Sequence, residues 1–372
     1  MSIRRTAQLL TAGLLGTLAC SRDQPGSRDQ PAAPAAAPTD GTTPAPRAAA
    51  AAPPAPTATA TPVAPVAPAT ITLAAPAASG GGPKVAQRCA LDGAPLGQHP
   101  ALVTVDDAIY VSDGAAVRRY RHDGGGDGDG CTLALDAGFG RAGQVAIPAL
   151  EPKPQTLGKG PIYMQSGGAD WKLGAAAGGV YAFDLLRGLY RVDRGRWEPA
   201  CKDLQGLRAL AGHGKSVTVW RDGVQALALR GCKLGETQTK AVRALGAVGA
   251  DLWIARDGKT LERRAAGEST ASATITSGDS FAPGGFCSLT AVTACGDGVC
   301  VVDNNCMKIA RFDRAGQFTR ELDTGALFAT RPYGLSGAST SAGGDLFLAA
   351  THREPGAGAG EGAIYRIAAA EF

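Results

Sequence analysis

The sequence has few residues of several chemically useful kinds. It contains only four histidines and only two asparagines, Asn304 and Asn305, and aromatic residues make up 5% of its 372 residues. No G-x-S-x-G motif is present, so nothing indicates the nucleophile elbow of an α/β-hydrolase. Four histidines also give little support to enzymes that use several of them as metal ligands or bases. The 52 glycines suit a fold with many tight turns.

Runs of basic residues are absent as well. The formal net charge is only +4, and the 37 Lys and Arg residues are spread along the chain. A nucleic-acid-binding face normally appears as a cluster of Lys and Arg. The charge pattern therefore predicts no nucleic-acid partner.

No apolar run is long enough for a membrane-spanning helix. The longest one at the start, Ala7 to Ala19, follows Arg4 and Arg5 and ends at Cys20. This order is typical of a secretory signal, and Thr17-Leu-Ala-Cys20 resembles a bacterial lipobox with Thr in place of the usual Leu. We predict a lipoprotein signal peptide at 1–19 and a lipid on Cys20; an ordinary signal with an incidental cysteine is the alternative.

The next segment, 20–83, consists mainly of Ala, Pro, Thr and Gly and contains no aromatic residue. Such a composition cannot bury a core, and its prolines favour an extended chain. We predict a disordered tether that holds a folded domain, 84–372, away from a membrane.

The stretch Gly298 to Leu322 reads as a three-stranded meander. Val299–Val302 and Ile309–Phe312 are short apolar runs separated by Asp-Asn-Asn, and Asp-Arg-Ala-Gly turns the chain into Gln317–Leu322. The pattern resembles one NHL repeat, with Lys308 where the family usually has Arg. The resemblance implies a blade of a β-propeller.

Similar copies recur along the domain, and this periodicity predicts an all-β repeat fold. Copies begin at Ile109, Val180, Val217, Leu252 and Leu346 in addition to Val299. The interval from Ile109 to Val180 is 71 residues, longer than the others. We predict a six-bladed β-propeller with an insertion in the second blade; a seventh, degenerate blade is the alternative.

The last copy ends too early to contain a fourth strand. Val85 to Gly93 resembles the outer strands that begin at Gly130 and Gly231. We therefore predict that residues 85–92 pair with the strand containing Ile364–Ile367 and close the ring, which protects two sheet edges.

Two sets of charged residues recur in the copies. The aspartates that follow the second strands are predicted to form turns by accepting backbone N–H groups: Asp113, Asp184, Asp222, Asp257 and Asp303. The arginines of the third strands would form a ring that either gathers an anionic ligand or holds adjacent blades together: Arg119, Arg191, Arg263, Arg311 and Arg366.

One loop contains a weak candidate metal site. Asp123, Asp127 and Asp129 alternate with glycines, so their carboxylates could converge on calcium. The spacing is not that of an EF-hand, and no Glu completes the site. The alternative is a Gly-rich hairpin tip, which would have the same residues. No other cofactor is predicted.

Nine cysteines are present, and eight remain once Cys20 is lipidated. An even number in an exported chain favours disulfides. Cys287, Cys295, Cys300 and Cys306 fall in one copy, but their spacing lacks the C-x-x-C pairs of structural zinc sites. Disulfides within this blade are the prediction, with a four-thiol metal site as the alternative.

Together these features predict a lipid-anchored protein of the bacterial cell envelope, facing the periplasm or the exterior. Its propeller would act as a binding module for a protein or glycan, in contact with the membrane only through the lipid. The alternative is a cation-dependent propeller hydrolase or lyase, which requires carboxylates from separate blades to converge at the channel mouth.

Overall fold

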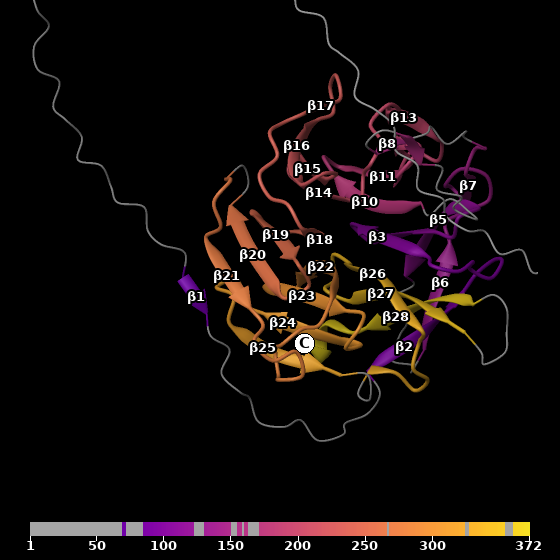
Figure 1. The fold of residues 1–372 in the computed structure, drawn as a ribbon. Helices are drawn as coiled ribbons and strands as arrows, with labels where there is room; N and C mark the ends of the chain where they lie inside the picture. The colour runs from indigo at the N-terminus through magenta and orange to yellow at the C-terminus, as the bar shows by residue number, and fades with distance from the viewer. Residues whose placement is uncertain are drawn as a thin grey trace, which may run out of the picture. The chain divides into compact units, whose positions relative to one another are not determined.

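The computed structural model describes residues 69–71, 85–122, 130–149, 155–157, 160–162, 171–265, 268–323, 327–353 and 360–372. All of them belong to one compact unit, Ala64–Phe372. The signal segment, Cys20 and the three aspartates Asp123, Asp127 and Asp129 lie outside the described residues. The described part is almost entirely β-structure (Figure 1), and its short helix is a single 3-10 turn, η1 (Ala369–Glu371). Among these residues, no helix has the length and apolarity needed to cross a membrane.

Four sheets are antiparallel meanders in chain order. One contains β10 (Lys172–Ala176), β11 (Gly179–Asp184), β12 (Gly188–Arg191) and β13 (Glu198–Cys201). The next contains β14 (Ala209–His213), β15 (Ser216–Trp220), β16 (Val224–Ala228) and β17 (Lys233–Leu234). A third contains β18 (Val242–Val248), β19 (Asp251–Arg256), β20 (Thr260–Ala265) and β21 (Ala273–Thr276). The fourth contains β22 (Leu289–Cys295), β23 (Gly298–Asp303), β24 (Lys308–Phe312) and β25 (Phe318–Leu322).

A larger, nine-stranded sheet joins the two ends of the domain. Its first run is β3 (Ala101–Val105), β4 (Ala108–Ser112), β5 (Ala116–His122) and β6 (Cys131–Leu135), and β7 (Gln144–Ala146) also pairs with β5. Its second run is β26 (Gly334–Thr340), β27 (Leu346–His352) and β28 (Glu361–Ile367). The strand β2 (Ala86–Leu91) lies between β28 and β6 and connects the two runs.

The long interval after the first copy contains a separate hairpin. Its strands are β8 (Gln155–Leu157) and β9 (Gly160–Ile162), which pair only with each other. No further four-stranded sheet is formed by the described residues between β7 and β10.

The second strands β11 and β23 are buried on both faces. Every residue of β11 and of β23 is buried, which explains why these runs are continuously apolar rather than alternating. Apolar clusters fill the spaces between neighbouring sheets, as where Trp253, Phe286 and Phe312 pack together. Each such fully buried side chain contributes roughly 1.5–3 kcal/mol.

The first strands of the sheets form a closed ring. Contacts run from β3 to β10, β14, β18, β22 and β26 and back to β3, and Figure 1 shows these strands around a common centre. Meanders arranged around a central axis are the arrangement of a β-propeller. The all-β prediction is confirmed, and the arrangement is propeller-like.

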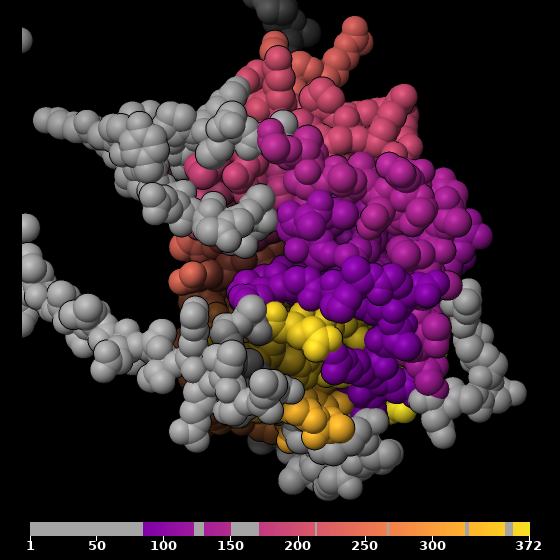
Figure 2. All heavy atoms as spheres, turned by 90° about the vertical axis from the view of Figure 1, so that its right-hand side faces the viewer, coloured from indigo at the N-terminus to yellow at the C-terminus, as the bar shows by residue number. Residues whose placement is uncertain are grey.

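The strand β2 joins the ends of the ring in an unexpected way. Its first half pairs antiparallel with β28, with Ala86 opposite Ile367 and Arg88 opposite Tyr365, as predicted. Its second half turns to β6 instead and pairs with it in parallel, with Cys89 opposite Cys131. In Figure 2, indigo atoms from the N-terminal part of the domain lie beside yellow atoms from its C-terminal part. The Cys89–Cys131 disulfide fixes the pairing of β2 with β6.

A short strand lies within the range predicted as the tether. The strand β1 (Ala69–Ile71) pairs in parallel with the outer strand β21. It belongs to Ala-Thr-Ile-Thr-Leu, a β-branched run between Pro68 and Pro76, and β-branched residues favour extended pairing.

Candidate functional site

The centre of the ring is a channel of about 250 Å³. Three consecutive residues of each inner strand line it: 102–104, 173–175, 210–212, 245–247, 292–294 and 338–340. None of these residues is charged. The channel wall therefore offers neither carboxylate ligands nor a cation for an anionic ligand.

One half of the channel wall is joined by hydroxyl groups. Thr104 and Ser339 are linked at 2.8 Å between their hydroxyl oxygens, and Thr293 and Thr340 at 3.3 Å. Each link connects the inner strands of two different sheet runs. These hydroxyls satisfy one another, so their role is to hold neighbouring strands together.

Glycines allow close contact in the other half. A Cβ atom on Gly212 would lie 2.2 Å from the Cα of Ala176, and one on Gly246 would lie 2.3 Å from the carbonyl oxygen of Val292. Only glycine permits the backbones of adjacent inner strands to approach this closely. The inner strands around the channel are thus packed closely against one another.

The five repeated arginines each pair with a carboxylate. The nitrogen–oxygen distances are 2.6 Å for Arg119–Asp136, 2.7 Å for Arg191–Asp193, 3.9 Å for Arg263–Asp251, 2.6 Å for Arg311–Asp297 and 2.7 Å for Arg366–Asp345. Two of them also donate to backbone carbonyls outside their own sheet. Arg263 bonds the carbonyl of Arg314, and Arg311 bonds the carbonyl of Phe372.

These ion pairs perturb the carboxylates involved. Burial alone would raise the pKa of Asp193, but the Arg191 guanidinium and the Val180 N–H outweigh burial and lower the pKa. The pKa of Asp136 is lowered in the same way. Burial would raise it, but the Gly138 N–H and the guanidinium groups of Arg121 and Arg119 outweigh burial. Both carboxylates are therefore ionised at neutral pH and are engaged within the protein.

Several of the turn aspartates accept backbone N–H groups. Asp113 accepts from Ala115 and Ala116, both at 3.0 Å, and Asp303 accepts from Asn305 at 3.0 Å and Cys306 at 2.9 Å. In Asp113 the carboxylate also pairs with Arg118 at 2.7 Å. The carboxylates are thereby occupied at the strand ends where they lie.

Four disulfides are present, so the prediction of disulfides is confirmed. They join Cys89–Cys131, Cys201–Cys232, Cys287–Cys306 and Cys295–Cys300, with Cα–Cα distances from 4.4 to 5.8 Å. The last two lie within the β22–β25 sheet and its preceding loop. Four disulfides fit a domain that folds in an oxidising compartment.

Among the described residues, one group brings three metal-ligating side chains together: Cys287, Asp303 and Cys306, whose donor atoms lie within 4.8 Å of one another. The two sulfur atoms are bonded to each other, and the Asp303 carboxylate accepts backbone N–H groups. All three come from one sheet and its adjoining loop. The group does not provide the thiolates and the carboxylates from separate blades that a catalytic cation requires.

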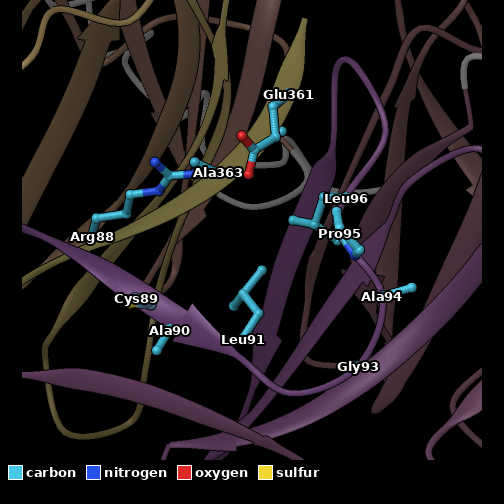
Figure 3. A pocket seen from close by; sticks show the side chains of 11 residues that line it. Arg88, Cys89, Ala90, Leu91, Gly93, Ala94, Pro95, Leu96, Glu361 and Ala363 are labelled. Carbon is cyan, nitrogen blue, oxygen red and sulfur yellow. Dashed lines mark hydrogen bonds and ion pairs between the residues drawn. The ribbon is translucent and has the colours of Figure 1, made fainter.

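A larger pocket, about 400 Å³, lies where β2 leaves β28 for β6. We call it the fork pocket. It is bounded by residues 88–91 of β2, the loop 93–96 and residues 361–363 of β28 (Figure 3). The Gly362 N–H donates to the Leu96 carbonyl at 3.2 Å, so the loop returns to β28 and encloses the space.

Charged and apolar side chains border the fork pocket. Arg88 and Glu361 form an ion pair at 2.8 Å, with 51% and 57% of their side chains exposed. Leu91 and Leu96 provide apolar surface on the other sides (Figure 3). Because the ion pair is half exposed, it contributes at most about 1 kcal/mol to stability, and its groups can exchange partners readily.

Two titratable groups lie beside this ion pair. His352 is opposite Glu361 on the neighbouring strand, and its Nε2 is 2.5 Å from the Tyr365 hydroxyl. Burial, together with the nearby Arg88 charge, lowers the pKa of His352, and burial raises the pKa of Tyr365. At neutral pH the imidazole is therefore uncharged and remains hydrogen-bonded to the Tyr365 hydroxyl.

Sequence reasoning identified the strand that forms this pocket but not the pocket itself. The similarity of Cys89 to Cys131 within two matching strands was the usable signal, because these cysteines prove to be bonded. Nothing local connects Arg88 with Glu361, which lie 273 residues apart in sequence.

The chain is distantly similar to several proteins of known structure. No family model and no curated protein matches the chain. Aldose sugar dehydrogenase from Streptomyces coelicolor, solved with bound PQQ, is similar with a TM-score of 0.43 and 10% identity over 73% of this chain and 96% of that one. The Pan2 WD40 domain of Neurospora crassa is similar with a TM-score of 0.40 and 10% identity, over 73% of this chain and 89% of that one. Glutaminyl cyclase of Myxococcus xanthus is similar with a TM-score of 0.35 and 13% identity, over 52% of this chain and 88% of that one.

Proposed function

We propose that this chain is a lipid-anchored envelope protein whose six-bladed, NHL-like β-propeller is a binding module facing the periplasm or the exterior. The blade number follows from dividing the nine-stranded sheet into two blades, β3–β6 and β26–β28 with β2. Each of these runs contributes one strand to the inner ring. Two of the repeated arginines, Arg263 and Arg311, then hold blades together through the backbone carbonyls of neighbouring segments.

The fork pocket is the observation that carries the binding function. It is the larger of the two hollows described above, it has an exchangeable ion pair at its border, and apolar leucines line it. Its volume falls within the range of small-ligand sites, about 300–1,000 Å³. The channel, by contrast, is smaller and its wall is uncharged.

A ligand screen on the full mature chain tests this proposal. Thermal unfolding is followed in the presence of libraries of short peptides, oligosaccharides and small organic acids. A ligand at 100 times its Kd adds about 2.7 kcal/mol, which raises Tm by about 5 °C in a domain of this size.

The pocket is assigned with a filling variant. Leu91→Trp should abolish the Tm shift of a genuine ligand, whereas Leu252→Trp, at a half-buried leucine of another sheet, should preserve it. If no library member gives a shift that Leu91→Trp removes, the fork pocket is not the site of a binding module.

The membrane anchor is tested separately. Cys20→Ala should release the protein from the membrane fraction, and mass spectrometry of the mature wild-type chain should find a diacylglyceryl group on an N-terminal Cys20. Cleavage elsewhere with an unmodified Cys20 thiol would refute the anchor. A calcium site at Asp123, Asp127 and Asp129 stays a prediction, and calcium-dependent Tm is its test.

A further inference from the structure

The pairing of β2 with β6 shows which backbone N–H groups of β2 point toward the fork pocket. The Asp92 N–H donates to Leu133 of β6, and successive N–H groups in a strand point to opposite sides. The Leu91 N–H therefore points away from β6, into the fork. On the β28 side, the Gly362 N–H is occupied by the Leu96 carbonyl, and Ile364, whose N–H points the same way, is fully buried and does not line the pocket.

The cross-strand ladder does not extend to the Leu91 N–H. The pairing of β2 with β28 ends at Arg88 and Tyr365, and no described strand pairs with Leu91 on this side. The Leu91 N–H thus faces the pocket that the Arg88 side chain also lines. A backbone donor and a guanidinium that line one pocket can each meet an oxygen of a carboxylate.

The shape of the space restricts the ligand to a chain end. The β2–β28 ladder closes one end of the fork, and the loop 93–96 closes the other through the Leu96–Gly362 bond. Because backbone closes both ends of the fork, an extended chain cannot run through it as a continuous added strand. Only a terminus can enter it from the open face.

We infer that the fork pocket binds the C-terminal carboxylate of an extended peptide, with the last side chain against Leu91 and Leu96. The carboxylate replaces Glu361 as the partner of Arg88, and the Leu91 carbonyl, which also faces the fork, accepts an N–H of the peptide. The inference rests on the proposed binding function and names its ligand class. The pairing of β1 with β21 shows that an outer edge of this domain already accepts an added strand.

The charge complementarity makes two opposite effects testable. Arg88→Gln removes the cation that the carboxylate needs, whereas Glu361→Gln removes the carboxylate that competes for Arg88. The first variant should weaken peptide binding and the second should strengthen it. A general structural defect would weaken binding in both.

The probe is a pool of hexapeptides with fluorescein on the N-terminus, random sequence and an apolar last residue, measured by fluorescence anisotropy with the full mature chain. We expect the free-acid pool to bind at least tenfold more tightly than the C-terminally amidated pool, a difference of about 1.4 kcal/mol. Arg88→Gln should weaken binding about tenfold, and Glu361→Gln should tighten it a few-fold. Arg221→Gln, at an exposed ion pair of another sheet, is the matched control and should change nothing.

The outcomes separate this inference from the proposed function. Equal binding of the acid and amide pools, or weakening by Glu361→Gln, would overturn the peptide inference. Displacement of the peptide by N-acetylleucine at equal concentration would show that a free carboxylic acid, not a peptide end, is the ligand. If sugars or small molecules bind in a Leu91→Trp-sensitive manner and peptides do not, the binding function stands and this inference fails.

Discussion

Removal of the Cys89–Cys131 disulfide should destabilise the propeller by about 4 kcal/mol. The bond spans 42 residues, and the chain-entropy relation for a loop of this length gives about 4 kcal/mol at 25 °C. The same relation gives about 2 kcal/mol for Cys295–Cys300, which spans only 5 residues. The longer loop restricts the unfolded chain more, so its removal costs more.

The two pairs are well matched for comparison. All four cysteines are at most 5% exposed, so replacing each pair by alanines removes similar buried volume. The remaining difference is the loop length and the location. Cys89–Cys131 joins the two ends of the ring, whereas Cys295–Cys300 lies within one hairpin of β22 and β23.

Urea unfolding under non-reducing conditions measures the effect, with far-UV circular dichroism and tryptophan fluorescence as two probes. With an m-value of about 3 kcal/mol/M, the midpoint should fall by about 1.3 M for Cys89→Ala with Cys131→Ala. For the Cys295 and Cys300 double variant it should fall by about 0.7 M. Equal losses, or a greater loss from the Cys295–Cys300 pair, would refute the argument from ring closure and loop length.

Three further predictions follow from the packing, the titrating groups and the termini. Gly212→Ala should cost several kcal/mol because its Cβ would overlap Ala176, whereas Gly278→Ala, where nothing lies within 4 Å, should leave Tm nearly unchanged; equal Tm values for the two would contradict the inner-strand contact. The pKa of His352 is lowered in the folded protein, so on acidification the imidazole of the unfolded chain is protonated first, and stability is lost as pH falls below about 6.5. His352→Gln should therefore reduce the fall of the urea midpoint between pH 7.5 and pH 5. An unchanged dependence of the midpoint on pH would rule out His352 as the cause. In native-state amide exchange, Gln87, whose N–H faces β28, should be protected like the blade interiors, and fast exchange there would show that β2 does not close the ring.

The local sequence predicts the middle of each sheet well. In the template repeat the expected strands were Val299–Val302, Ile309–Phe312 and Gln317–Leu322, and the structure has β23, β24 and β25 at these positions. The strands β23 and β24 contain apolar, β-branched residues bounded by Asp and Gly, because they are buried and end in tight turns. The outer strand β25 is exposed or half-buried except at Leu322 and was marked mainly by the Gly-containing turn before it. Both causes act within a few residues and leave a readable pattern.

The inner strands leave a weaker pattern. Strands such as β14 and β26 contain Gly, Ala, Ser and Thr, because their backbones lie almost against one another around the axis. Small residues of this kind also occur in loops and linkers, so the pattern did not indicate the channel. Its hydroxyl and glycine contacts join residues from different repeats and become visible only once the ring is closed.

The fork pocket depends on tertiary structure entirely. The sequence alone determined that residues 85–92 form a strand resembling other outer strands, since this information lies in the strand itself. Which edges that strand joins was decided by the meeting of the two chain ends, which brings β28 to one side of β2 and β6 to the other. The ring geometry forces β2 to change partners after Arg88, and this change creates the space that Arg88, Leu91 and Glu361 border.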